Sequence, residues 1–337
     1  MRLLVVKTSS MGDVIHTLPA VTDALAALPG LEVGWAVEKP FAPLVRLHPG
    51  IRRVHEVELR RWRGRALFAS EARKARSIWK SELKSAGYDR VIDAQGLMKS
   101  AFLARMAGAP IDGLSFSSIR EWPAALAYHR RHAVRRDLHA VTRVRTLFGA
   151  ALGYSPGLDV VNFGIAGAPS SGADTAFLLH GTSWRTKEWP LANWIAIARA
   201  LAERGMKPVA TWSDGRELAT VEAIAAATPL EIVPRTGLGE IADQICKAGL
   251  AIGVDTGLTH LAAALGVPTV ALYVASRPGL TGPVGARTTA LVADGLPETG
   301  FASRTGASAD AASITPAMVL DAAATLLGRE GSATSGA

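Results

Sequence analysis

The chain has 337 residues, 49% of them hydrophobic and 20% charged, a balance typical of a folded globular enzyme and not of a disordered chain. This length exceeds what one hydrophobic core usually serves, so we expect two domains. No apolar run is long enough to span a membrane, the N-terminal apolar stretch is too short for a signal peptide, and the single cysteine, Cys246, excludes an intramolecular disulfide. Together these features predict a cytoplasmic protein.

The net charge of +8 is unevenly distributed along the chain. Residues 1–170 contain 25 Lys and Arg against 14 Asp and Glu, whereas the remaining residues contain 12 against 15. Basic residues are densest between Arg60 and Lys84, and four more arginines lie between Arg130 and Arg136. The first half therefore either carries a solvated basic helix face or binds an anion, such as a nucleic acid, an anionic membrane or an anionic substrate.

The first half alternates short apolar runs with amphipathic stretches, which predicts strands separated by helices. We expect strands at residues 3–6, 31–37, 53–57 and 90–93. We expect helices at residues 14–28, 66–86, 97–107 and 133–152. A stretch rich in Gly, Ala, Ser and Pro follows, and we interpret residues 166–173 as a linker.

The second half repeats this alternation. Its expected strands are residues 176–180, 208–212, 230–233, 250–254 and 269–274, and its expected helices are 191–203, 217–226, 238–247, 259–265 and a final helix, 316–327. Residues 328–337 are expected to be a disordered tail. Strands that alternate with helices predict parallel sheets, so we expect two doubly wound α/β domains, 1–165 and 174–327, whose strand-end loops face a cleft.

The loop after the first strand, residues 7–13, ends in a carboxylate at the start of a predicted helix. Ligands in open α/β sheets bind outside the carboxyl ends of the strands, so Asp13 is a candidate proton acceptor. A helix N-terminus also keeps a carboxylate ionised, as a base requires. The alternative is that Asp13 is only the N-cap of this helix.

The loop at residues 180–190 of the second half offers polar groups suited to a diphosphate. Thr182 and Ser183 supply hydroxyls and Lys187 supplies a cation. The alternative is an ordinary strand-to-helix loop with a surface lysine.

Two further loops of the second half could bind a nucleotide sugar. In residues 253–260, Gly257 allows close backbone approach, and Asp255 could bind sugar hydroxyls. The alternative there is helix capping by Asp255 or Thr256. In residues 212–217, an acidic side chain could hold ribose hydroxyls, although Glu217 would also suit the first turn of a helix.

Several motifs are absent from the sequence. No G-x-G-x-x-G follows the first strand, and no P-loop motif is present. No Asp-x-Asp pair occurs to hold a metal-bound nucleotide sugar, and His129 and His132 lie among arginines. We therefore expect no metal site and no protein-bound cofactor.

Five stretches, in order along most of the chain, together resemble the ADP-heptose–lipopolysaccharide heptosyltransferases, glycosyltransferase family 9. They are residues 7–14, 60–63, 93–100, 182–190 and 254–260. The Lys-Thr-Ser-Ser-Met form of the first stretch favours the type I enzymes, which add the first heptose, over those that add the second. Residues 273–278 depart from the Tyr-Gly-Pro-Thr-Asp-Pro of many relatives, so we exclude this loop from the predicted site.

The resemblance implies a GT-B fold and an inverting transfer of L-glycero-D-manno-heptose from ADP-heptose to a Kdo residue of Kdo-lipid A. It implies that Asp13 is the general base. The implied donor contacts are Thr182, Ser183, Lys187, Glu217, Asp255, Thr256, Gly257 and His260. The acceptor contacts that we assign by hypothesis are Arg60, Arg61, Arg63, Lys99 and Arg120. Because the acceptor is a lipid, we expect peripheral association with the anionic cytoplasmic face of the inner membrane.

Three alternatives remain open from the sequence. A heptosyltransferase that acts later and uses a heptosyl acceptor differs from our choice only in its acceptor. A nucleic-acid-binding protein would suit the basic first half, but no recognition motif is present. A nicotinamide oxidoreductase would suit the sheets, but the glycine fingerprint is missing.

Overall fold

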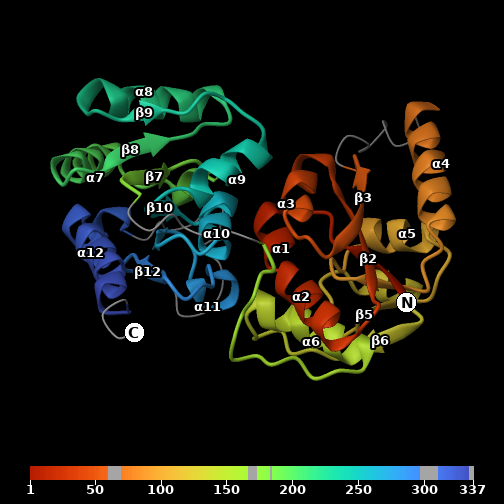
Figure 1. Cartoon of the computed structure of the whole chain (residues 1–337). Coiled ribbons are helices and arrows are strands. Elements are labelled where there is room, and N and C mark those ends of the chain that lie inside the picture. The colour runs from red at the N-terminus through yellow and green to blue at the C-terminus, as the bar shows by residue number, and fades with distance from the viewer. Residues whose placement is uncertain (60–69, 166–172, 183, 297–309, 334–337) are drawn as a thin grey trace. The chain divides into compact units, whose positions relative to one another are not determined.

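A computed structural model describes residues 1–59, 70–165, 173–182, 184–296 and 310–333. The chain forms two compact units, Met1–Ile165 and Ala166–Ala337 (Figure 1). The predicted linker, 166–173, lies almost entirely outside the described residues. None of the helices in the described part of the chain combines the length and the apolar character that a bilayer span requires.

In the first unit, the described residues form a six-stranded sheet in the order β3-β2-β1-β4-β5-β6. Its strands are β1 (Arg2–Val6), β2 (Glu32–Glu38), β3 (Ile51–Val57), β4 (Arg90–Asp93), β5 (Ile111–Leu114) and β6 (Arg130–His132). Its helices are α1 (Met11–Ile15), α2 (Leu18–Ala27), α3 (Ala42–Arg46), α4 (Ser70–Ser85), α5 (Met98–Met106) and α6 (Ala140–Leu152), with 3₁₀ turns η1 (Lys39–Phe41) and η3 (Trp122–Ala127). All of the strand pairs are parallel, and β1 lies next to both β2 and β4.

The second unit repeats this topology, with the strand order β12-β11-β10-β7-β8-β9 in its described residues. Its strands are β7 (Thr175–Leu179), β8 (Lys207–Ala210), β9 (Glu231–Ile232), β10 (Leu250–Val254), β11 (Thr269–Tyr273) and β12 (Thr288–Val292). Its helices are α7 (Leu191–Glu203), α8 (Gly215–Ala227), α9 (Leu238–Cys246), α10 (Gly257–Ala264), α11 (Pro278–Thr281) and α12 (Pro316–Ala333), with 3₁₀ turns η4 (Arg185–Lys187) and η5 (Ala311–Ser313). Again every pair is parallel.

This architecture confirms the predicted class of two doubly wound parallel sheets, each with its own apolar core. Buried Val, Leu and Ile side chains of β1 and β4 pack in the first unit, and those of β7, β10 and β11 pack in the second. In each unit the strand order reverses at the first strand, between β1 and β4 and between β7 and β10. Ligand sites are expected at these two switch points.

Two predicted helices of the first unit differ from the structure. The helix expected at 14–28 is two helices, α1 and α2, because Pro19 in the first turn of α2 has no backbone N–H to continue the hydrogen-bond ladder. The helix expected at 133–152 begins only at Ala140, because Arg136 extends to the Ile119 carbonyl in the segment before it and His139 forms the N-cap.

The final helix, α12, continues to Ala333, beyond the end expected at residue 327. A single glycine, Gly328, costs about 1 kcal/mol in a helix and does not by itself end it. The last four residues lie outside the described residues.

Candidate active site

One candidate site lies at the switch point of the second unit, where Lys187, Asp255 and His260 meet. Lys187 belongs to the η4 turn after β7, Asp255 follows β10, and His260 is the fourth residue of α10. Lys187 Nζ is 2.5 Å from Asp255 Oδ2, and His260 Nε2 is 3.4 Å from Asp255 Oδ1. The parallel register of β7 and β10 brings these loops together.

Asp255 stays ionised in this cluster. Burial acts to raise its pKa, but the hydrogen bond from His260 and the charge of Lys187 outweigh burial and hold the pKa well below its ordinary value. The Lys187 ammonium carries three N–H donors, so its ion pair with Asp255 leaves it able to bind a further anion. The Lys187 Nζ also lies 4.8 Å from the centroid of the Trp184 ring.

Ser276 is a member of this cluster that the sequence analysis missed. Its buried hydroxyl donates to Asp255 Oδ2 at 2.6 Å, from the loop 273–278 that we had excluded. The loop that we excluded from the predicted site thus contacts Asp255 through Ser276, a contact that the sequence did not predict. Beneath it lies Tyr273, whose buried hydroxyl has no hydrogen-bond partner among the described residues. Burial, followed by the charge of Asp255, raises the pKa of Tyr273.

The start of α10 adds backbone donors to the site. Thr256 occupies the N-cap position and Gly257 is the first residue of the helix. The first N–H groups of a helix have no partner within it and carry a partial positive charge, so this end of α10 suits an anion. The capping alternative and the ligand-site interpretation are compatible here.

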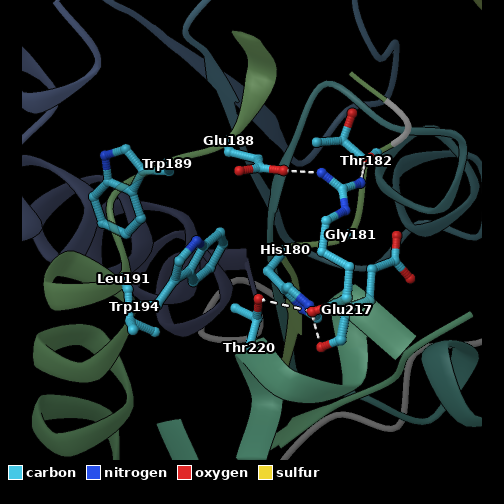
Figure 2. A pocket seen from close by; sticks show the side chains of 10 residues that line it. His180, Gly181, Thr182, Glu188, Trp189, Leu191, Trp194, Glu217 and Thr220 are labelled. Atoms are coloured by element: carbon cyan, nitrogen blue, oxygen red, sulfur yellow. Dashed lines mark hydrogen bonds and ion pairs between the residues drawn. The ribbon is translucent and has the colours of Figure 1, made fainter. Parts of the chain in front are cut away.

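A pocket in the same unit surrounds Glu217, in the first turn of α8 (Figure 2). The cavity has a volume of about 120 Å³, and its lining includes His180, Gly181, Thr182, Trp194 and Glu217. The Glu217 Oε2 accepts hydrogen bonds from the backbone N–H and the hydroxyl of Ser213, each at 2.7 Å. This arrangement fixes a carboxylate beside the loop that follows β7.

Gly181 and His180 shape this pocket. A Cβ on Gly181 would lie 2.6 Å from Glu217 Oε1, so only glycine allows the carboxylate to approach the loop this closely. The His180 Nε2 lies 3.3 Å from the Glu217 carbonyl oxygen, and its ring packs edge-on against Trp194. Burial lowers the pKa of His180, which is consequently neutral at pH 7.

Thr182 is buried, and Arg216 donates to its carbonyl at 2.6 Å, while Arg216 also forms an ion pair with Glu188. The remaining predicted diphosphate contact, Ser183, lies outside the described residues.

The switch point of the first unit holds Asp13. It is the third residue of α1 and not its N-cap, which is Ser10. Asp13 Oδ2 accepts the Ser10 backbone N–H and hydroxyl, each at 2.8 Å, and Oδ1 lies 3.6 Å from Lys7 Nζ. Its side chain remains 44% exposed, so a substrate hydroxyl can reach it.

The pKa of Asp13 is lowered. Partial burial opposes ionisation, but Lys7, the two hydrogen bonds from Ser10 and the nearby His16 outweigh it. Lys7 is buried and also donates to the Ala94 carbonyl at 3.0 Å. The sequence analysis did not identify Lys7, a buried lysine beside the accessible carboxylate of Asp13, as a functional residue.

The loop after β4 holds the Asp13 loop in place. The Gln95 amide oxygen accepts the backbone N–H groups of Thr8 and Ser9 at 3.0 and 3.1 Å. Asp93, fully buried, in turn accepts the backbone N–H of Gln95 at 2.9 Å and the hydroxyl of Tyr128 at 2.7 Å. Burial raises the pKa of Asp93.

The predicted acceptor contacts are placed only in part. Lys99 lies on α5, half-buried, and Arg120 is exposed in the segment before η3. Arg60, Arg61 and Arg63 lie outside the described residues. Among the described residues, no group of three or more His, Cys, Asp and Glu side chains is arranged to hold a metal ion.

The first unit thus contains an accessible ionised carboxylate, which can remove a proton from a nucleophile. The second unit contains a lysine, a helix N-terminus and fixed carboxylates, which can stabilise an anionic leaving group.

Residues 76–305 match the family model described as glycosyltransferase family 9 (heptosyltransferase). The chain belongs to this family. The chain is 43% identical to lipopolysaccharide heptosyltransferase 1 of Pseudomonas aeruginosa over 291 residues, which cover 85% of this chain and 82% of the relative. It is 39% identical to lipopolysaccharide heptosyltransferase 1 of Escherichia coli K12 over 292 residues, which cover 85% of this chain and 91% of the relative.

Solved structures agree with this membership. The structure of Escherichia coli heptosyltransferase WaaC with ADP superposes with a TM-score of 0.86 at 36% identity, covering 95% of this chain and 98% of that chain. WaaC with ADP-2-deoxy-2-fluoro heptose superposes with a TM-score of 0.83 at 35% identity and the same coverage. The resemblance to the type I enzymes and the GT-B fold are confirmed, and the chain is a glycosyltransferase.

Proposed function

We propose that this glycosyltransferase transfers L-glycero-D-manno-heptose from ADP-heptose to a Kdo residue of Kdo-lipid A, with inversion at the anomeric carbon. The observation that carries the proposal is the Lys187–Asp255–His260 cluster at the N-terminus of α10, which can bind a diphosphate and a sugar together. The names of the relatives, and the ADP and ADP-heptose analogue bound to WaaC, support the same donor.

In the proposed reaction, Asp13 removes the proton of the attacking Kdo hydroxyl. The hydroxyl oxygen forms a bond to the anomeric carbon of the heptose as the bond from that carbon to the ADP oxygen breaks. Lys187 and the N–H groups of α10 stabilise the negative charge that ADP carries away. Glu217 binds the ribose hydroxyls, and Asp255 and His260 orient the heptose.

We further propose that the basic first unit binds the Kdo carboxylates and lipid A phosphates. Arg60, Arg61, Arg63, Lys99 and Arg120 are the proposed contacts. An enzyme that uses a lipid acceptor acts at a membrane surface, so we propose peripheral association with the cytoplasmic face of the inner membrane.

Purified protein, ADP-heptose and Kdo-lipid A test this proposal, with ADP release and product mass as the readouts. We expect one heptose to be added by the wild type, and a fall in kcat of about 10²- to 10⁴-fold for Asp13→Asn, with donor binding retained. Turnover only on an already heptosylated acceptor would move the enzyme to a later step. Full activity of Asp13→Asn would reject the base.

A further inference from the structure

Four large apolar side chains of the first unit lie exposed on two neighbouring elements. Met98 and Phe102 on α5 are 51% and 54% exposed, and Trp122 and Leu126 on η3 are 62% and 63% exposed. The two residues of each pair are four positions apart in the sequence. Other apolar side chains on the same two elements are buried, namely Leu103, Ala104, Ala124 and Ala125. Single exposed apolar side chains are ordinary, but a group of four is not.

These side chains form one surface because α5 and η3 run side by side. At one end, the Met98 backbone N–H donates to Glu121 Oε2 at 2.7 Å, directly before η3. At the other end, Arg105 and Leu126 line a common cavity. We call Met98, Phe102, Trp122 and Leu126 the apolar patch.

Basic side chains surround the apolar patch. Arg105 is exposed on α5, and Arg130 and Arg131 are exposed on the edge strand β6. Arg131 Nε donates to the carbonyl of Ala125 in η3, and its guanidinium lies 5.3 Å from the ring centroid of Phe116, which is itself 48% exposed.

The neighbouring helix α4 extends this charge, because it packs against α5 (Figure 1). Its exposed basic side chains are Arg73, Lys74, Lys80 and Lys84, and its exposed acidic ones are Glu71 and Glu82. Glu121 is the acidic side chain at the end of the patch itself. The described surface over α4, α5, η3 and β6 is therefore apolar at its centre and cationic around it.

We propose that the apolar patch inserts into the interface of an anionic lipid bilayer while the surrounding arginines and lysines bind its headgroups. An apolar centre with a cationic rim is complementary to such a bilayer, whose acyl boundary lies beneath negative headgroups. This inference rests on the proposed function, because a membrane partner follows from a lipid acceptor.

The patch is also continuous with the loop that carries the candidate base. Helix α5 begins at Met98, three residues after Gln95, whose amide oxygen binds the backbone of Thr8 and Ser9 in the Asp13 loop. Docking through α5 would therefore place the bilayer close to the point where the acceptor sugar must arrive.

The test measures flotation of the full-length chain with vesicles of phosphatidylglycerol and phosphatidylethanolamine, and with vesicles of phosphatidylcholine alone. Two double variants are compared with wild type: Trp122→Ser/Leu126→Ser removes apolar contacts and Arg105→Glu/Arg130→Glu reverses charge. The matched control is Leu158→Ser/Val160→Ser, which removes two exposed apolar side chains of the same unit outside the patch.

We expect wild type and control to bind the anionic vesicles alike, and each patch variant to bind at least about tenfold more weakly. Phosphatidylcholine vesicles should bind all of them weakly. Circular dichroism and thermal melting check that each variant is folded.

Wild-type binding by folded patch variants would overturn the proposal. So would a dimer of the wild type, seen by sedimentation, that the patch variants convert to monomers, because the patch would then bind a second copy. Turnover of Kdo-lipid A separates the two proposals. If the wild type transfers heptose but the patch variants bind vesicles as it does, only the patch proposal is rejected. If the patch variants lose vesicle binding but the wild type has no transferase activity, only the proposed function is rejected.

Discussion

Asp13 illustrates how neighbouring side chains set the state of one carboxylate. Its ion pair with Lys7 and its hydrogen bonds from Ser10 favour the ionised form over the protonated one. A carboxylate with a lowered pKa is a weak base in water, but it is fully available as a proton acceptor at pH 7. In the proposed reaction, Lys7 would therefore act through Asp13 as a positioning residue.

Lys7→Met should move the acid limb of the kcat/KM profile to higher pH. The charge of Lys7 lowers the pKa of Asp13, so removing that charge raises the pKa, and as the pH drops activity then begins to fall at a higher pH than in the wild type. Lys7→Arg should keep the wild-type limb. The measurement is kcat/KM between about pH 4.5 and 8; identical profiles for all three proteins would contradict the role of Lys7.

Ser276→Ala should weaken donor binding by about tenfold. A hydrogen bond to a charged group contributes about 1.5–3 kcal/mol, and this variant removes the 2.6 Å bond that holds the Asp255 carboxylate. Ser276→Thr retains the hydroxyl and should restore binding. Calorimetric titration with ADP-heptose measures the effect, and an unchanged Kd in the alanine variant would exclude the contact from the site.

The sequence predicted candidate residues for the site, but not all of their contacts. Loops that follow strands predicted Asp13, Lys187 and Asp255, because parallel strands must bring such loops to one edge of a sheet. The contacts of Lys7 and Ser276 could not be predicted in this way. Lys7 donates to the Ala94 carbonyl and Ser276 donates to Asp255, each on another loop, and no local pattern encodes such a contact.

At the scale of elements, the first turn of α8 depends on the loop after β7. Gly181→Ala should raise the donor KM severalfold, because the added Cβ must displace Glu217 from its contact with Ser213. Because the atoms that the Cβ meets are at the end of a flexible side chain, which can move, we expect little change in stability. Gly215→Ala, at the start of the same helix, meets nothing within 4 Å and should leave the KM unchanged. Steady-state kinetics on both variants make the comparison, and equal donor KM values would contradict it.

Elements with strong apolar periodicity were predicted well, and those without it were missed. Three strands were not expected from the sequence: β5, β6 and β12. In β5, Asp112 is buried against Arg90 and His132, and in β6 three charged or polar residues complete the sheet edge. Their strand form comes from pairing with a neighbour and not from local propensity.

At the scale of the whole molecule, each unit has its own core and its own stabilising contacts. In the first unit, Arg145 is buried between α6 and α2, where its guanidinium binds both oxygens of Asp23. The exposed pair of Arg135 and Asp137 lies in the same unit. The two pairs differ mainly in burial, and therefore in what their loss should do.

Arg145→Met should destabilise the first unit by about 3–5 kcal/mol, because it leaves Asp23 charged, partly buried and unpaired. Arg135→Ala should leave the melting temperature unchanged.

ADP at 100 times its Kd should raise the stability of the unit that binds it by about 2.7 kcal/mol. Differential scanning calorimetry separates these effects: a shift of both transitions by ADP alone would contradict independent cores.

The division between the units falls at one point of the chain, between Ile165 and Ala166. If the proposed division of substrates holds, everything that selects the lipid is encoded before this point and everything that selects the nucleotide sugar after it. A single genetic recombination event could then exchange one specificity and leave the other intact. Such a gene layout would let a lineage of enzymes explore new acceptors while inheriting an unchanged donor half.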